Sequence, residues 1–150
     1  MKTYKISNNS SIELREPAIN YLNGNRSIMD KVRLIRDGIH YVVFKELRKT
    51  VPFTDEEWSV LLDMSLKSLQ RYDKEGTHIF KLIHSERILE IVEVCELGIE
   101  TFGDPDKFHD WCLDGMPALN NIPPIDLIRD SYGKELVIGE LHAINHGVFA

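Results

Sequence analysis

Apolar residues recur at helical spacing along almost the whole chain, and this periodicity constrains the fold more than any other feature. From residue 27 onward they follow one another at intervals of three and four. Capping residues such as Ser27 and Ser65 begin the segments, and glycines such as Gly38 and Gly76 end them. No stretch alternates apolar and polar residues between hairpin turns. The sequence therefore predicts an all-α fold.

The segment at residues 85–102 has the broadest apolar face. Such a face is too wide for one partner surface and is typical of a helix at the centre of a domain or in a dimer interface. Thr54 followed by Glu57 forms a capping box at the start of another segment. The expected helices cover residues 27–37, 41–51, 54–62, 65–72, 85–102, 104–113, 124–128 and 131–145.

Charge divides the chain into two unequal halves. Residues 1–83 contain 14 Lys and Arg against 11 Asp and Glu, whereas residues 84–150 contain 4 against 13. This asymmetry favours two surfaces with different partners, although it also fits charges scattered over a solvated surface. Residues 1–25, rich in Asn and Ser, are expected to form a flexible arm with a short extended piece at 12–14. The predicted domains are 26–83 and 84–150.

The composition argues for a cytoplasmic binding protein. No apolar run approaches the roughly 20 residues of a membrane span, and no apolar stretch follows the N-terminal lysines as in a secretory signal. Cys95 and Cys112 fall on separate segments and are expected to be reduced thiols. Glycine-rich phosphate loops, nucleophile elbows and paired-cysteine zinc sites are absent from the sequence. We therefore expect no enzymatic activity and no cofactor.

A zinc site is the weakest of the alternatives. His142 and His146 stand four residues apart on one helix, but Ala143 replaces the glutamate of a metalloprotease and no third ligand is evident. We therefore expect no metal.

The segment 54–76 has the pattern of two capped helices joined by a short turn. In the second helix Leu66 and Leu69 are expected to face inward and polar residues outward. Arginine and glutamine hydrogen-bond base edges, and lysine and serine hold phosphates. The segment therefore favours a helix-turn-helix, although an ordinary helical hairpin with a solvated face has the same pattern. The candidate DNA-binding residues are Ser65, Lys67, Ser68, Gln70, Arg71 and Lys74.

The chain ends on an apolar tail after the helix-stopping Gly147. Terminal residues usually fray, so Val148 and Phe149 either fold back on the core or fill a pocket of a partner.

Residues 30–150 resemble the Xre/MbcA/ParS-type antitoxins, the partners of RES-domain toxins. The resemblance rests on the run 101–108, Thr-Phe-Gly-Asp-Pro-Asp-Lys-Phe, followed by Trp111-Cys112-Leu113, and on Pro117-Ala118-Leu119-Asn120. It extends to 124–128, to the ending 144–150 and to an Xre-like recognition helix at 65–76. The chain departs from the family at 120–124, where Asn-Asn-Ile-Pro-Pro replaces a Gly-Gly or Gly-Arg-Thr-Pro approach.

The resemblance implies a homodimeric antitoxin of a type II toxin–antitoxin system. Its C-terminal half would cover the active site of an NAD-consuming RES-domain toxin, and its Xre-like half would bind operator DNA and repress its own operon. The alternative is a stand-alone helix-turn-helix regulator whose acidic half has an unrelated partner. The implied toxin-binding residues are Leu119, Asn120, Asn145, His146, Gly147, Val148, Phe149 and Ala150.

Overall fold

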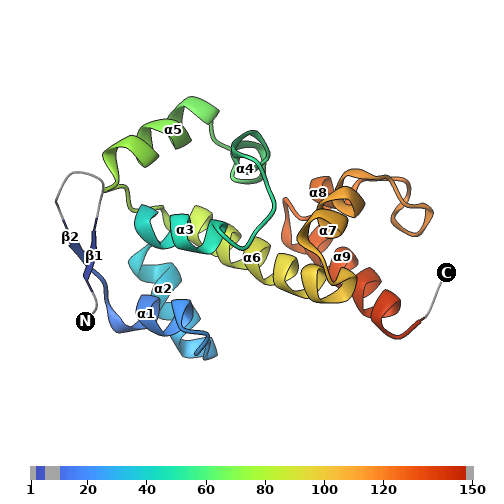
Figure 1. Ribbon diagram of the computed structural model, residues 1–150, viewed down its shortest axis with the longest axis horizontal. Helices are drawn as coiled ribbons and strands as arrows, with labels where there is room; N and C mark the ends of the chain where they lie inside the picture. Colours follow the sequence, from blue (N-terminus) through green and yellow to red (C-terminus); the bar gives the residue numbers. More distant parts are fainter. Residues whose placement is uncertain (1–2, 6–10, 148–150) are drawn as a thin grey trace.

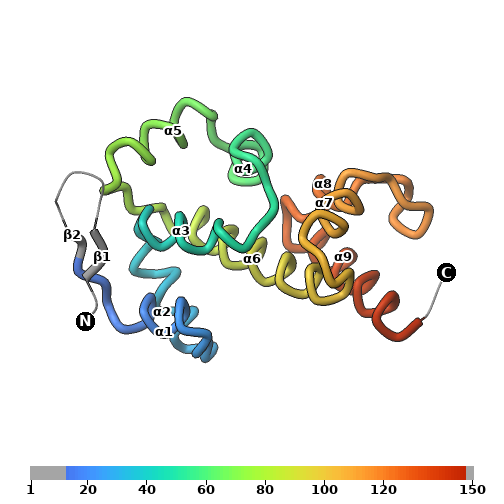
Figure 2. The backbone as a smooth tube through the Cα atoms, in the orientation of Figure 1, coloured from blue at the N-terminus to red at the C-terminus, as the bar shows by residue number. Residues whose placement is uncertain are grey.

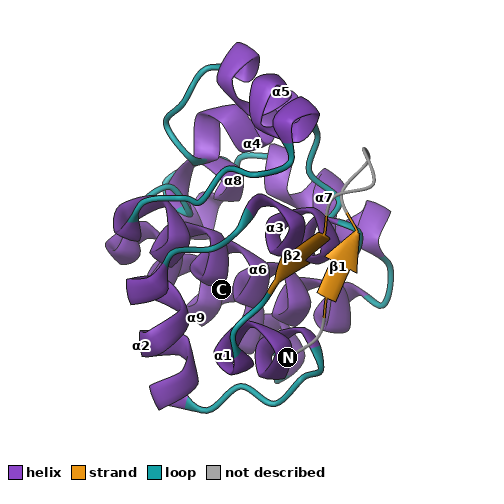
Figure 3. Ribbon diagram, turned by 90° about the vertical axis from the view of Figure 1, so that its left-hand side faces the viewer, coloured by secondary structure: helices purple, strands orange, loops and turns teal. Residues whose placement is uncertain are grey.

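The all-α prediction is confirmed by the computed structural model, which describes residues 3–5 and 11–147 (Figure 1). One short antiparallel pair, β1 (Thr3–Lys5) and β2 (Ser11–Glu13), lies near the N-terminus and overlaps the predicted extended piece (Figure 3). The helices are α1 (Glu16–Leu22), α2 (Ile28–Asp37), α3 (Tyr41–Arg48), α4 (Asp55–Leu61), α5 (Leu66–Glu75), α6 (Leu82–Phe102), α7 (Pro105–Leu113), the 3-10 turn η1 (Pro117–Leu119), α8 (Pro124–Leu127) and α9 (Ser131–Asn145).

Helix α6 is the central element of the fold, and Figure 2 shows it crossing the middle of the molecule. Helices α2 and α3 pack against it, as do α7 and α9. Its buried apolar side chains are Ile88, Leu89, Ile91, Val92, Val94 and Cys95. The broad apolar face predicted at 85–102 is therefore covered within one chain. For this reason its breadth no longer supports a homodimer.

The expectation of a flexible arm at residues 1–25 is wrong for residues 14–22. Pro17 stands in the first turn of α1, where its fixed φ and missing N–H are tolerated. Leu14 and Tyr21 are both fully buried in the core. The sequence signal was weak because only a few apolar residues face inward, and they are buried through contacts with distant parts of the chain.

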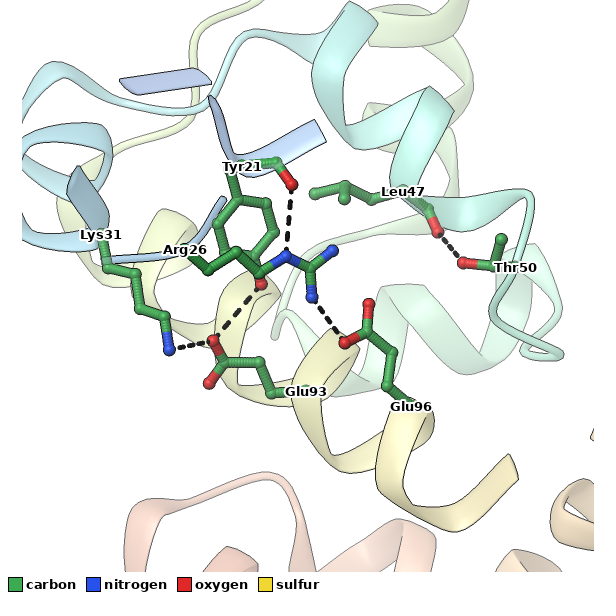
Figure 4. A network of polar contacts seen from close by, with 7 residues as sticks. All are labelled: Tyr21, Arg26, Lys31, Leu47, Thr50, Glu93 and Glu96. Carbon is green, nitrogen blue, oxygen red and sulfur yellow. Dashed lines mark hydrogen bonds and ion pairs between the residues drawn. The ribbon is translucent and has the colours of Figure 1, made fainter. Parts of the chain in front are cut away.

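Polar contacts hold this N-terminal region against α6 (Figure 4). The Arg26 guanidinium donates from Nε to the Tyr21 carbonyl at 3.2 Å and forms an ion pair with Glu96 at 2.5 Å. It also lies 4.1 Å from the centre of the Tyr21 ring. One turn earlier on α6, Glu93 pairs with Lys31 at 2.6 Å and accepts from the Tyr21 hydroxyl at 3.5 Å. These ion pairs join basic residues of the 1–83 half to acidic residues of the 84–150 half, so they neutralise part of the opposite charges of the two halves.

Most helix starts and stops lie where the sequence placed them. The side chains of Ser27 and Ser65 cap α2 and α5, and both hydrogen bonds of the Thr54–Glu57 capping box are present. Gly76 ends α5 in the left-handed conformation, at φ 71°. The start of the long helix is an exception, because it was expected at residue 85 and α6 begins at Leu82. Ser85 is buried in its first turn, where its hydroxyl accepts from Ile39 N and donates to Phe80 O.

Helices α6 and α7 approach closely at Gly98. A Cβ atom there would lie 2.0 Å from Cε1 of the buried Phe108 ring. The free thiols of Cys95 and Cys112 are buried on these two helices, and burial raises the pKa of both. Among the described residues, no helix has the length and apolarity needed to cross a membrane.

Candidate functional site

Helices α4 and α5 form a pair joined by a tight turn. The turn passes through Asp63, whose φ of 51° lies in the left-handed region that asparagine and aspartate tolerate better than most residues. Met64 N donates to the Ser59 carbonyl at 3.0 Å, and Ser65 then caps α5 by accepting from Ser68 N at 3.0 Å. The direction of α5 is therefore fixed relative to α4 by local hydrogen bonds.

The predicted outward stripe on α5 is exposed. Lys67, Gln70, Arg71 and Lys74 follow one another at helical intervals, and all four side chains reach solvent. The Arg71 guanidinium is 4.0 Å from Glu75 and 5.3 Å from the centre of the Tyr72 ring, and exposed contacts of these kinds contribute little. These side chains are free to meet a partner surface. What they bind stays a prediction.

The two serines of the predicted set have a structural role in the helix start. The Ser65 hydroxyl donates to Ser68 Oγ at 2.8 Å while it accepts the capping bond from Ser68 N. Ser68 is half-buried, unlike its four charged or amide-bearing neighbours. Ser65 and Ser68 therefore shape the first turn of α5, and fewer of their hydrogen-bonding sites are open to a partner.

Helix α5 lies at the edge of the molecule, with its outer face away from α6 (Figures 1 and 3). It is anchored through the buried Leu69 and through Tyr72, whose ring stacks on His78 at 3.4 Å between centroids. His78 also meets the buried Phe80 ring edge-on, and burial lowers the pKa of His78. Among the described residues, the contacts of α5 thus come from its inner side, and its outer side chains are exposed.

A group of lysines and an arginine that the sequence analysis did not single out lies beside α5. Lys45 and Arg48 of α3, and Lys49 at its C-cap, line a surface hollow of about 370 Å³ together with Gln70 of α5. Two carboxylates line the same hollow: Asp73 is 3.3 Å from Lys45, and Asp55 pairs with Arg48. The i, i+4 spacing of Lys45 and Lys49 was visible in the sequence. Their position beside α5 depends on how α3 packs.

The second predicted surface lies at the other end of the molecule, around the 114–123 loop and the end of α9 (Figure 1). Asn120 is exposed in the left-handed conformation at φ 56°, directly after η1, and η1 packs against α9. Leu119, by contrast, is buried, with 6% of its surface exposed. Its side chain is withdrawn from solvent and does not itself present a surface.

At the end of α9, Asn145, His146 and Gly147 are exposed. The His146 ring is 2.7 Å from the carbonyl of His142, which orients it along the last turn. The remaining members of the predicted toxin-binding set, Val148, Phe149 and Ala150, lie outside the described residues. In the part of the chain that is described, no three His, Cys, Asp or Glu side chains are grouped so as to hold a metal ion.

A polar contact joins α7 to α4. Nε2 of His109 on α7 is 2.8 Å and 3.0 Å from the two carboxylate oxygens of Glu57 on α4. Glu57 also accepts from Thr54 N at 2.9 Å as part of its capping box. His109 is partly buried, and this contact ties α7 to α4.

Comparison with known proteins supports the fold assignment. No protein-family model matches the chain, and no curated protein matches it in sequence. Among solved structures, the chain is similar to a chain of the crystal structure of the M. tuberculosis MbcT–MbcA toxin–antitoxin complex. The similarity has a TM-score of 0.57 at 21% sequence identity, and it covers 71% of this chain and 94% of the other.

Proposed function

We propose that this protein is the antitoxin of a type II toxin–antitoxin system and inhibits its toxin by binding, without catalysis of its own. The observation that supports this most is the fold, which resembles a chain of a toxin–antitoxin complex over 94% of that chain's length. The resemblance of 101–128 and 144–150 to the Xre/MbcA/ParS-type antitoxins points the same way. The proposed toxin is a RES-domain, NAD-consuming enzyme.

In this proposal the toxin binds at the end of the molecule that carries Asn120 and the end of α9. The apolar tail Val148-Phe149-Ala150 enters the toxin's active site and excludes NAD by occupying its volume. Burying one aromatic side chain in a pocket contributes roughly 1.5–3 kcal/mol, which is about a tenfold to hundredfold change in affinity. A few anchoring residues of this kind would carry most of the binding energy.

Co-expression with the neighbouring reading frame tests the proposal. The full chain should restore growth of cells that express the toxin, and a chain ending at Gly147 should not, while both unfold at the same temperature. Tyr132→Ala is the matched control, because it removes a 90% exposed aromatic ring from the other end of α9. Full rescue by the truncated chain would exclude the tail as the inhibitory element, and failure of the full chain to rescue would count against the antitoxin function.

We also propose that α4 and α5 form a helix-turn-helix that represses the protein's own operon. The specific observation in favour is the open stripe Lys67, Gln70, Arg71 and Lys74 on a helix that is anchored from one side. If Arg71 reads a base, Arg71→Ala should weaken operator binding by about 1–3 kcal/mol in a sequence-selective way. Gel shifts at matched salt measure this. Unchanged binding by a Lys67/Gln70/Arg71 triple alanine variant would remove the assignment.

The repressor is proposed to act as a homodimer, because helix-turn-helix operators are commonly two-fold symmetric. Sedimentation at micromolar concentration should then give about twice the chain mass of 17.3 kDa. A monomer that still binds a single half-site would contradict this.

The competing proposal is a stand-alone transcriptional regulator. It predicts operator binding without a toxin in the neighbouring reading frame. Growth rescue separates the two, since only an antitoxin restores growth.

A further inference from the structure

The hollow between α3 and α5 is positioned to hold the DNA backbone beside the predicted recognition helix. Gln70, one of the predicted base-reading residues, lines it together with three basic residues at the C-terminal end of α3: Lys45, Arg48 and the C-cap Lys49. Lys45 lies on α3, and Lys49 caps the end of α3 in the helical conformation one turn later, so their side chains extend in a similar direction. We propose that Lys45 and Lys49 contact phosphates of the duplex that α5 enters, an inference that rests on the proposed DNA-binding function.

Groove geometry supports this position. A recognition helix fills a major groove about 12 Å wide, so phosphates of both strands flank it on either side. Side chains next to the helix, and on a neighbouring element, therefore face backbone and not base edges. The lysine ammonium is a compact point charge on a flexible stem, which suits it to phosphate.

The charge and exposure of the two lysines fit the role. The Lys45 side chain is 59% exposed and the Lys49 side chain 64% exposed. Lys45 pairs with Asp73 at 3.3 Å and Lys49 with Glu46 at 2.8 Å. Because exposed ion pairs contribute little to stability, either lysine can exchange its partner for a phosphate at small cost. Arg48 differs, since it is only 20% exposed and is paired with Asp55.

The same contacts give Asp73 a role of opposite sign. Its carboxylate is 52% exposed and lines the hollow, so it would repel a phosphate held there. Removing this charge should strengthen DNA binding. If Lys45 only stabilised the fold, removing the charge of Asp73 would not be expected to strengthen DNA binding.

Salt-dependent binding of DNA tests the proposal. The probes are the duplex immediately upstream of the reading frame and a scrambled duplex of equal length. Each phosphate contact contributes about 0.9 to the slope of log affinity against log salt. Lys45→Gln/Lys49→Gln should therefore lower the slope by about 1.8, and each lysine should account for about an eightfold loss of affinity at 0.1 M salt.

The loss should be equal on both duplexes, because phosphate contacts carry no sequence information. Asp73→Asn should raise affinity for both duplexes. Lys107→Gln, which changes an exposed lysine on α7, is the matched control and should leave binding unchanged. Circular dichroism melts of each variant confirm that the fold is retained.

If the double variant has an unchanged salt slope while Arg71→Ala still loses operator preference, the phosphate site is overturned. The assignment of α5 as the recognition helix is then unaffected. Unchanged or weaker binding by Asp73→Asn also overturns it. If the unmodified protein shows no salt-dependent binding to either duplex, the proposed DNA-binding function itself fails, and this inference fails with it.

Discussion

Replacing Gly98 by alanine tests the packing of α7 on α6, on which the C-terminal surface depends. The added Cβ would lie 2.0 Å, 2.3 Å and 2.6 Å from three atoms of the Phe108 ring. That ring is fully buried and has Phe102 and Trp111 as neighbours at centroid distances of 6.3 Å and 6.1 Å. Phe108 therefore has to shift against packed rings and cannot swing into solvent.

Two effects oppose each other in this variant. Overpacking of a core costs about 1–3 kcal/mol, whereas replacing glycine by alanine inside a helix gains up to about 1 kcal/mol. Because all three contacts are far shorter than van der Waals distance, we expect overpacking to dominate and the free energy of unfolding to fall by about 2 kcal/mol. For a chain of this size each kcal/mol shifts Tm by about 2–4 °C, so Tm should fall by about 4–8 °C.

The matched control is Gly139→Ala on α9, where no heavy atom lies within 4 Å of the added Cβ. This variant should melt at or a few degrees above the unmodified protein, because only the helix-propensity gain applies. Thermal and urea unfolding followed by circular dichroism measure both. Combining Gly98→Ala with Phe108→Leu should recover part of the loss, since the two residues share one space. A Gly98→Ala protein that is as stable as the parent would refute the α6–α7 packing described here.

Three other predictions follow from the described contacts. Tyr21→Ala should lower the free energy of unfolding by about 3–5 kcal/mol, while Tyr21→Phe should lower it by under about 1 kcal/mol because the hydrogen bond from the hydroxyl to Glu93 is long. Similar melting temperatures for the two variants would contradict the packing of α1 against the core. Burial lowers the pKa of His40, His78 and His84, so the unfolded chain binds more protons and the free energy of unfolding should decrease as pH falls from 7.5 to 5.5. Equal or higher stability at pH 5.5 in urea unfolding would contradict this. A double-mutant cycle of Glu57→Gln and His109→Gln should give an interaction energy of about 0.5–3 kcal/mol, whereas additive effects would mean that the contact contributes nothing.

The sequence predicted what local interactions determine. The capping bonds at Thr54 and Ser65 join residues three apart, so their signals lie within one turn of chain. The exposure of Lys67, Gln70, Arg71 and Lys74 follows from helical spacing together with the buried Leu69. These parts of the fold and of the first candidate surface could be predicted without any knowledge of tertiary packing.

Features that depend on distant contacts could not be predicted in this way. Tyr21 and its partner Glu93 are 72 positions apart, so nothing near Tyr21 in the sequence showed that α1 would be docked. The long helix was expected to begin at residue 85, but α6 begins at Leu82, and the buried Ser85 hydroxyl bonds Ile39, which is 46 positions away. For the same reason, the sequence did not show that Lys45 and Lys49 lie beside α5. Nor did it show that Leu119, a predicted toxin-binding residue, is buried.

The contact between Glu57 and His109 limits how strongly the C-terminal surface can affect α5 by way of α7 and α4. Glu57 fixes the start of α4, α4 fixes α5 through the turn at Asp63, and His109 belongs to the helix that precedes the 114–123 loop. A partner that displaced α7 would remove one contact of Glu57 and leave its capping bond. The interaction energy expected for this contact, about 0.5–3 kcal/mol, corresponds to a roughly 2-fold to 150-fold change in affinity. A larger effect of a C-terminal partner on DNA binding would therefore have to act through another route, such as α6 or a change in oligomeric state.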